Sequence, residues 1–262
     1  MTSISSGCPS HSFDEAPALR RHAEAHFLEA FMKIGIVGAG NIGQVLAERF
    51  TQCGHDVSIA NSRGPDSLRD IERTTGAKAV EAREAVKGAE VVVVTIPEAK
   101  VPGLPKDLFA GVPANVVVVD TGNYYPQQRD GRIEAIEKGM PESRWVEQQI
   151  GRPVVKAFNN IYAAHLRKNG KPKGTAGRIA LPVAGDDHRA KSVVMKLIDE
   201  IGFDAVDAGE IDDSWRQQPA TPVYTADLDA DGLRAALQKA DPVRKPAWRA
   251  TDSSPGTFEN PA

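Results

Sequence analysis

The pattern with the most specific chemical meaning is Gly-x-Gly-x-x-Gly, which follows directly after the apolar stretch 33–37. Its first glycine, Gly38, permits a tight turn, and its second, Gly40, lets the backbone approach a pyrophosphate. Its third, Gly43, lets a helix pack closely on a strand, and the N–H groups at the start of that helix attract an anion. The sequence therefore predicts a dinucleotide site at Gly38, Ala39, Gly40, Asn41, Ile42 and Gly43.

The residues that follow the next apolar stretch predict which dinucleotide is bound. Enzymes that use NAD usually place Asp or Glu there, about twenty residues beyond the glycines, to hold the ribose 2′-hydroxyl. This chain has Asn61, Ser62 and Arg63 instead, so no carboxylate would repel a phosphate. A guanidinium offers a planar fork to a 2′-phosphate, and Ser62 adds a hydroxyl. We therefore expect NADP(H) rather than NAD(H).

Polar or turn-forming residues also follow the later apolar stretches. Thr95, Ile96 and Pro97 end one of them, and Asn123 comes shortly after the stretch 116–119. Ligands of a parallel sheet lie beyond the carboxyl ends of its strands. We therefore expect the first three residues beside the dinucleotide and Asn123 near the nicotinamide. Residues of these types are also common in ordinary loops, so an unspecific role stays open.

A lysine lies inside a further apolar stretch, residues 153–158. Lys156 either extends to the edge of the sheet or points its ammonium at an anion in the cleft, and we expect it to contact the cofactor. Two adjacent amides, Asn159 and Asn160, follow this stretch. Amide side chains can hydrogen-bond a carboxamide or a flavin-like ring, so we expect these two to bind the substrate.

Strands and helices must alternate for these residues to meet. Short apolar runs predict buried parallel strands, and apolar stripes at helical spacing predict amphipathic helices between them. This order predicts an α/β fold, namely a Rossmann-type parallel sheet with a smaller C-terminal α/β domain. The expected divisions are an N-terminal extension at 1–31, an NADP-binding Rossmann domain at 32–150, a smaller α/β substrate domain at 151–240 and an irregular tail at 241–262.

The composition excludes several other classes of protein. With 41% hydrophobic residues and a net charge of −3, the chain is not mainly disordered. The 32 basic and 35 acidic residues are balanced, so a nucleic-acid partner is not expected. Cys8 and Cys53 are too few for a disulfide scaffold or a four-cysteine zinc site, and no apolar run approaches the ~20 residues of a membrane span. We therefore expect a cytoplasmic protein without a metal or a membrane partner.

Six segments of the chain resemble the NADP oxidoreductases of the coenzyme F-420-dependent type, in particular bacterial relatives described only as dinucleotide-binding enzymes. They are MKIGIVGAGNIGQVLAERF, IANSRG, VVVVTIP, VVDTGNYYP, VVKAFNNI and LPVAGDD, within residues 32–225. The resemblance implies that an acceptor binds between the dinucleotide-binding domain and the smaller domain. It also implies that the three glycines hold the pyrophosphate, and Ser62 and Arg63 the 2′-phosphate. Deazaflavin enzymes commonly have a histidine where this chain has Asn159 or Asn160, so a flavin, a quinone or a carbonyl compound stays open beside coenzyme F-420.

The chain is therefore expected to be an enzyme, an NADPH-dependent oxidoreductase that transfers a hydride between NADP(H) and a planar acceptor such as a flavin or deazaflavin. Hydride transfer between stacked rings needs little acid–base chemistry, which agrees with the lack of a predicted catalytic His or Cys. Two alternatives stay open: a non-enzymatic NADP(H)-binding sensor or docking module, and an imine or carbonyl reductase with Lys156 as proton donor. The expected partner is the small-molecule acceptor, and a homodimer is left open.

Overall fold

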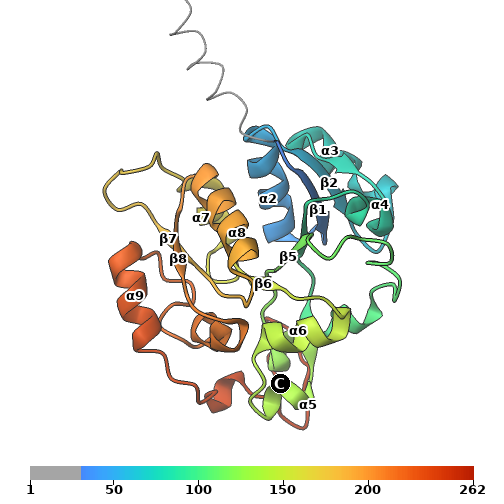
Figure 1. Cartoon of the computed structure of the whole chain (residues 1–262). Coiled ribbons are helices and arrows are strands. Elements are labelled where there is room, and N and C mark those ends of the chain that lie inside the picture. Colours follow the sequence, from blue (N-terminus) through green and yellow to red (C-terminus); the bar gives the residue numbers. More distant parts are fainter. Residues whose placement is uncertain (1–30) are drawn as a thin grey trace, which may run out of the picture. The chain divides into compact units, whose positions relative to one another are not determined.

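Apolar, β-branched runs form a six-stranded parallel sheet in the computed structural model, which describes residues 31–262 (Figure 1). The strands are β1 (Lys33–Val37), β2 (Asp56–Ala60), β3 (Lys78–Ala79), β4 (Val91–Val94), β5 (Val117–Asp120) and β6 (Val155–Lys156). Their spatial order, β3-β2-β1-β4-β5-β6, is that of the Rossmann fold and confirms the predicted fold class. The chain order reverses between β1 and β4, where ligands of such sheets bind. The predicted N-terminal extension lies, apart from Phe31, outside the described residues.

Helices and helical turns connect the strands. They are α2 (Asn41–Gln52), η1 (Pro65–Leu68), α3 (Arg69–Thr75), α4 (Ala82–Val86), η2 (Glu98–Gly103), η3 (Pro126–Asp130), α5 (Glu134–Glu137), α6 (Glu142–Ile150), α7 (Ala163–Lys168), α8 (His188–Glu200), η4 (Ile211–Gln217), α9 (Ala230–Gln238) and η5 (Pro246–Trp248). Within residues 31–262, none of the helices combines the length and the apolar content that crossing a membrane requires.

The central strand β4 shows that the sheet is buried on both faces. All four of its valines are buried, and side chains alternate along a strand. Val91 and Val93 belong to one hydrophobic cluster, which residues of α2 and α8 join. Val92 and Val94 belong to another cluster, which residues of α4 and of the loop before β5 close. The uninterrupted apolar run in the sequence is therefore the signature of a strand covered on both sides.

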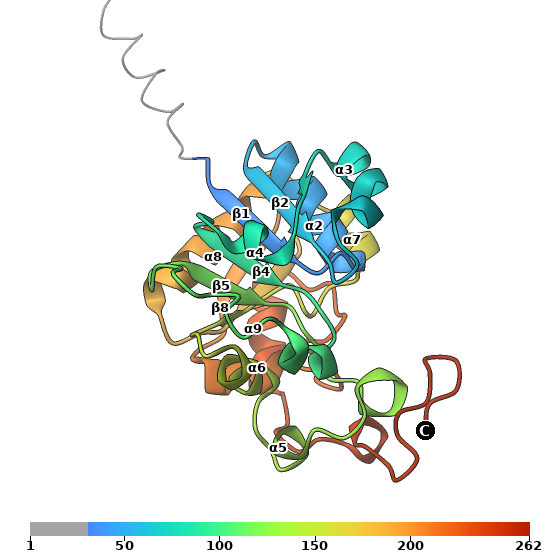
Figure 2. The same ribbon diagram turned by 90° about the vertical axis from the view of Figure 1, so that its right-hand side faces the viewer.

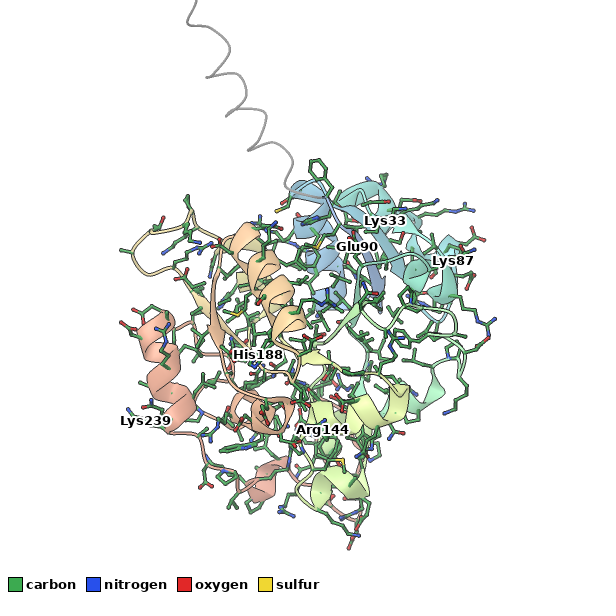
Figure 3. The ribbon with its side chains drawn as sticks, in the orientation of Figure 1. Lys33, Lys87, Glu90, Arg144, His188 and Lys239 are labelled. Carbon is green, nitrogen blue, oxygen red and sulfur yellow. The ribbon has the colours of Figure 1, made fainter. Side chains whose placement is uncertain are left out.

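A second, two-stranded parallel sheet consists of β7 (Ala180–Val183) and β8 (Asp204–Asp207). Apolar residues of β7 share the cluster that α2 and α8 form with the large sheet. Arg144 on α6 adds ion pairs to Asp186, which follows β7, and to Asp212, at 3.0 and 2.8 Å (Figure 3). Residues 32–262 accordingly form one compact unit. The division predicted at residue 150 falls inside this unit, because β6, expected in the smaller domain, pairs with β5 as the last strand of the large sheet.

The tail at 241–262 contains the helical turn η5 and otherwise has no regular structure, but it is held to the rest of the protein. Gln127 Nε2 donates a hydrogen bond to the carbonyl oxygen of Arg249 at 2.8 Å, and the backbone N–H of Gly256 donates to the carbonyl oxygen of Gln127 at 2.7 Å. Arg244 donates to the buried carboxylate of Glu142 at 2.6 Å. Figure 2 shows this segment running beside α5. The tail thus packs on the loops that follow β5.

Gly35 in β1 provides a test of how helix α4 packs on the large sheet, because α4 lies directly against Gly35. A Cβ atom at Gly35 would lie 1.8 Å from the carbonyl oxygen of Ala85. We expect Gly35→Ala to lower the free energy of unfolding by about 1–3 kcal/mol, as overpacking of a core does. Urea denaturation measures this loss. Gly103→Ala is the matched control, since a Cβ there meets nothing within 4 Å. Equal stability of the two variants would contradict the packing.

Candidate functional site

The glycine turn between β1 and α2 has the geometry that its sequence predicts. Gly38 has a φ of 123°, and a Cβ atom on it would lie 2.1 Å from the carbonyl oxygen of Thr95. A Cβ atom on Gly43 would lie 2.1 Å from the carbonyl oxygen of Gly38. Gly40, by contrast, has no atom within 4 Å of where its Cβ would be. It precedes α2, whose first turn has no acidic residue and no side-chain cap. Open space and free N–H groups therefore meet at the start of α2, as an anion site requires.

The segment after β2 lies next to this turn, because β1 and β2 are paired and the N–H of Gly38 donates to the carbonyl oxygen of Ala60 at 2.8 Å. Asn61 shapes the segment. Its Oδ1 accepts from the backbone N–H of Arg63 at 2.8 Å, and its Nδ2 donates to Ser67 Oγ at 2.9 Å. Ser62 and Arg63 are exposed, and the guanidinium of Arg63 has no hydrogen-bond partner within residues 31–262. The hydroxyl of Ser62 and the guanidinium of Arg63 are thus available to a ligand beside the glycine turn. Asn61 instead holds the backbone of this segment through its hydrogen bonds.

A cleft of about 390 Å³ opens beyond the carboxyl ends of the central strands. It is bounded by the start of α2, the loops after β4 and β5, and the segments 159–163 and 224–225. Of the residues predicted from the sequence, eight line it: Gly40, Asn41, Ile42, Thr95, Ile96, Pro97, Asn123 and Asn159. Nine further residues line it, among them Tyr125, Arg129, Tyr162 and Tyr224, to which the sequence analysis assigned no role.

Two asparagines, from the loops after β5 and β6, form part of the cleft wall. Asn123 Nδ2 donates to the carbonyl oxygen of Asn159 at 2.9 Å, and Asn159 Nδ2 donates to Asn123 Oδ1 at 3.0 Å. Gln217 Nε2 donates to Asn159 Oδ1 at 3.0 Å. Phe158, directly before Asn159, is buried with a φ of 62°, a conformation that costs free energy for a residue other than glycine. The surrounding contacts therefore hold this amide pair in place. Asn160, which the sequence analysis also predicted to bind the substrate, is buried and does not line the cleft.

Lys156 differs most from its predicted role. Its side chain is fully buried, and its ammonium donates to Asp120 Oδ2 at 3.1 Å and to the carbonyl oxygen of Gly122 at 2.6 Å. The reason is strand register: β5 and β6 pair so that Asp120 lies opposite Lys156. Asp120 also accepts from Ser143 Oγ at 2.6 Å. The ammonium therefore does not reach the cleft, contrary to the prediction of a cofactor contact, and it is not placed to donate a proton there.

A second buried carboxyl group lies behind the same loop. Glu98 is fully buried, neither of its carboxyl oxygens has a hydrogen-bond partner among residues 31–262, and a Cβ on Gly122 would come within 2.4 Å of Glu98 Oε1. Burial, and next the charge of Asp120, raise the pKa of Glu98 well above its usual range. Burial opposes the charge of Lys156, but the neighbouring acidic groups, Asp120 first among them, outweigh it, so the pKa of Lys156 is raised. These two shifts favour the charged form of Lys156 and the protonated form of Glu98.

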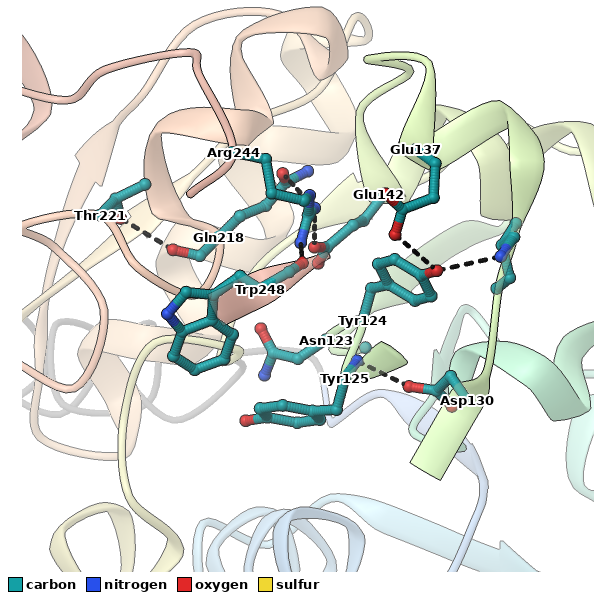
Figure 4. A network of polar contacts seen from close by, with 12 residues as sticks. Asn123, Tyr124, Tyr125, Asp130, Glu137, Glu142, Gln218, Thr221, Arg244 and Trp248 are labelled. Carbon is teal, nitrogen blue, oxygen red and sulfur yellow. Dashed lines mark hydrogen bonds and ion pairs between the residues drawn. The ribbon is translucent and has the colours of Figure 1, made fainter. Parts of the chain in front are cut away.

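An aromatic group completes the cleft on the side of the tail. The hydroxyl groups of Tyr125 and Tyr224 are hydrogen-bonded to each other. The ring of Trp248 lies 6.0 Å from the ring of Tyr125, centroid to centroid (Figure 4). The ring of Phe258 lies 5.4 Å from the ring of Tyr125. Tyr125 had a sequence signal, since it belongs to the loop after β5. The other three had none, because they lie far along the chain in segments without regular periodicity.

Residues 33–124 match the family described as NADP oxidoreductase, coenzyme F-420-dependent. This stretch begins with β1 and ends at Tyr124, so it includes the glycine turn and the loops after β2, β4 and β5. The match thus covers the predicted dinucleotide site and leaves out Asn159 and the residues of the tail.

Three individual proteins are similar to the chain. The crystal structure of a hypothetical protein from Sinorhizobium meliloti is 31% identical, with a TM-score of 0.67 over 79% of this chain and 100% of that one. A candidate F-420-dependent NADP reductase from Arthrobacter sp. FB24 is 22% identical, with a TM-score of 0.55 over 69% and 86%, and shows a shared fold. The Escherichia coli (strain K12) protein YjhV is 46% identical over 77 residues, which are 29% of this chain. That match spans about half of YjhV, 53% of its length.

Glu98 yields a prediction on the dependence of stability on pH. The folded chain keeps a proton on Glu98 that the unfolded chain releases above its ordinary pKa of 4.5. The free energy of unfolding should therefore fall as the pH rises above 4.5 toward the raised pKa, by about 1.4 kcal/mol for each unit by which the pKa is raised. Glu98→Gln should remove this contribution and be more stable than the wild type at pH 8. Denaturant unfolding at several pH values measures it.

The control for this experiment is Glu84→Gln, which changes an exposed carboxylate. It should keep the pH dependence of the wild type. If Glu98→Gln also kept that dependence, Glu98 would not be the buried proton-binding group.

Proposed function

Because the dinucleotide-binding part of this chain belongs to the coenzyme F-420-dependent family of NADP oxidoreductases, and thus to the NAD(P)-dependent oxidoreductases, we propose that the protein is an NADPH-dependent oxidoreductase. In this proposal it transfers a hydride between NADP(H) and a planar acceptor of the flavin, deazaflavin or quinone type. The observation that carries the proposal is the open space at Gly40 over the uncapped start of α2, inside a cleft with aromatic walls.

The glycine turn fits the pyrophosphate of a dinucleotide. A side chain at position 40 would occupy the open space next to the N–H groups of α2, and glycine keeps it clear. The dipole of α2, a helix of 12 residues, favours an anion at this end. Thr95, Ile96 and Pro97 line the neighbouring wall after β4. We assign the pyrophosphate to the turn and the nicotinamide ring to the part of the cleft beyond β4 and β5.

Ser62 and Arg63 support NADP(H) as the dinucleotide. Both side chains are exposed next to the glycine turn. The backbone there is held by the hydrogen bond that Asn61 Oδ1 accepts from the N–H of Arg63. A carboxylate at this position would bind the ribose of NAD and repel a 2′-phosphate. In this proposal the guanidinium of Arg63 pairs with the 2′-phosphate and the hydroxyl of Ser62 donates to it.

The rest of the cleft can bring two rings together and keep water away. Bound NADPH supplies a hydride from its nicotinamide ring. Asn123 and Asn159, joined by two hydrogen bonds, present a fixed polar wall. Tyr125 and Tyr224 add aromatic surface to the same cleft. Positioning of this kind makes the larger contribution to hydride transfer between stacked rings, so no acid or base is required of Lys156.

The first test concerns the choice of dinucleotide. Arg63→Ala should weaken NADPH binding by about 10- to 100-fold, since a hydrogen bond to a charged group contributes roughly 1.5–3 kcal/mol. The dissociation constant of NADH should stay the same. Isothermal titration calorimetry measures both. Arg69→Ala, which removes an exposed arginine paired with Asp66, is the control. An equal loss for NADPH and NADH would overturn the assignment of Arg63.

The second test concerns the reaction. Stopped-flow absorbance at the NADPH band should show oxidation in the presence of coenzyme F-420, flavins or quinones. Turnover with at least one of these planar acceptors is the expected result. Tight NADPH binding without turnover with any of them would favour a non-enzymatic NADP(H)-binding protein instead.

A further inference from the structure

Two tyrosines reach the cleft from distant parts of the chain. Tyr125 follows β5, and Tyr224 lies 99 residues further along. Both line the cleft, and their hydroxyl groups are hydrogen-bonded to each other. Within residues 31–262, neither hydroxyl has another hydrogen-bond partner. The pair is therefore a polar spot on the aromatic part of the cleft wall, and binding of the dinucleotide gives its hydroxyl groups no role.

The pair has one hydrogen to offer to a ligand. Two phenol groups carry two hydrogens, and the bond between them uses one. Burial raises the pKa of both Tyr125 and Tyr224, so both groups keep their hydrogen at neutral pH. The remaining hydrogen has no acceptor in the described part of the chain. A ligand in the cleft can supply that acceptor if it carries an oxygen with free lone pairs.

The backbone and a cation hold the two rings. The guanidinium carbon of Arg129 lies 5.0 Å from the centre of the Tyr125 ring, and Arg129 Nη2 donates to the carbonyl oxygen of Asn123 at 2.5 Å. Thr225, directly after Tyr224, has a φ of 58° and donates its N–H to the carbonyl oxygen of Asn160 at 2.8 Å. A residue other than glycine keeps such a conformation only where its surroundings impose it. The tyrosine pair is therefore preorganised.

The tail contributes a third ring to this arrangement. Trp248 lies against both tyrosines, with ring centroids 6.0 Å from Tyr125 and 6.3 Å from Tyr224. It is not among the residues that line the cleft, so it acts on a ligand only through the tyrosines. This contact gives the irregular segment at 241–262 a role in the site.

We propose that the Tyr125–Tyr224 pair donates a hydrogen bond to a carbonyl oxygen of the hydride acceptor, and that Trp248 is the positioning residue of this pair. The inference rests on the proposed function. It requires that the planar acceptor ring is conjugated with a carbonyl group. The chemistry is shared by flavin-like rings and quinones. Both spread the charge of an added hydride onto a carbonyl oxygen, where a fixed donor stabilises it.

The test compares two tricyclic probes of similar size in the presence of saturating NADP⁺, which permits binding without turnover. Lumiflavin carries two ring carbonyl groups and phenazine carries none. The double variant Y125F/Y224F should bind lumiflavin about 3- to 10-fold more weakly than the wild type, as the loss of one hydrogen bond predicts. Its dissociation constant for phenazine should stay within about twofold, because both rings remain. Fluorescence titration measures both constants.

The outcomes separate the hydrogen bond from simple packing. An equal loss for the carbonyl probe and for phenazine would overturn the inference, and so would no loss for the carbonyl probe that the wild type binds. A wild type that binds neither lumiflavin nor the quinone menadione would overturn it as well. Menadione in the same titration distinguishes the two sources of the carbonyl group: the variant should lose affinity for whichever class the wild type binds. NADPH oxidation is measured separately. If the wild type oxidises NADPH but the double variant binds both probes as tightly as the wild type, this inference is overturned and the proposed function is left intact.

Trp248 is tested in the same assay. Trp248→Ala should weaken lumiflavin binding as the double variant does and raise KM for the acceptor more than it lowers kcat, while Trp248→Phe should restore most of the affinity. Trp215→Ala is the matched control, because Trp215 lies on η4 and stacks with Arg216 rather than with either tyrosine. A loss of the same size in Trp215→Ala, or no loss in Trp248→Ala, would show that Trp248 does not position the pair.

Discussion

The buried ion pair between Lys156 and Asp120 joins the last two strands of the large sheet where the chain leaves β5 for the cleft. Two charges taken out of water are tolerated only where further hydrogen bonds satisfy them, and the loss of one partner from such a pair costs about 3–5 kcal/mol. Ser143 and the backbone of Gly122 provide these bonds. The loop that presents Asn123 and Tyr125 is thereby fixed at its base. This one ion pair therefore supports the part of the cleft wall that the loop forms, although neither of its charged groups lines the cleft.

The proposed site has two halves, one for the dinucleotide and one for the acceptor, and they are built in different ways. The dinucleotide half is local: one strand, one turn and the start of one helix supply the glycines, and the paired strand β2 brings Ser62 and Arg63 beside them. The acceptor half is assembled from distant segments, with Tyr125 and Tyr224 lying 99 residues apart, and strained residues hold two of these segments. Phe158 and Thr225 both have positive φ angles, and the N–H of Thr225 bonds the carbonyl oxygen of Asn160. Strain at both segments is consistent with a site whose geometry is imposed by its surroundings.

The tail gives the acceptor half its outer support. Hydrogen bonds to Gln127 and an ion pair between Arg244 and buried Glu142 attach it to the loops after β5. Trp248 then packs on Tyr125 (Figure 4), and Phe258 packs on the same ring. A segment without regular structure can therefore be as well placed as a helix, because side-chain contacts replace the missing backbone hydrogen bonds.

The sequence by itself determined the parallel sheet, the glycine turn and the absence of a carboxylate after β2. Each of these follows from patterns within a few residues, such as apolar runs and glycine spacing. The tertiary structure decided what becomes of Lys156, which the sequence could not distinguish from a cleft residue, because strand register alone sets Asp120 opposite it. It also decided that Asn159 lines the cleft while Asn160 is buried. Only the fold could bring Tyr224 and Trp248 to Tyr125, because contacts between residues a hundred positions apart leave no periodic trace in the chain.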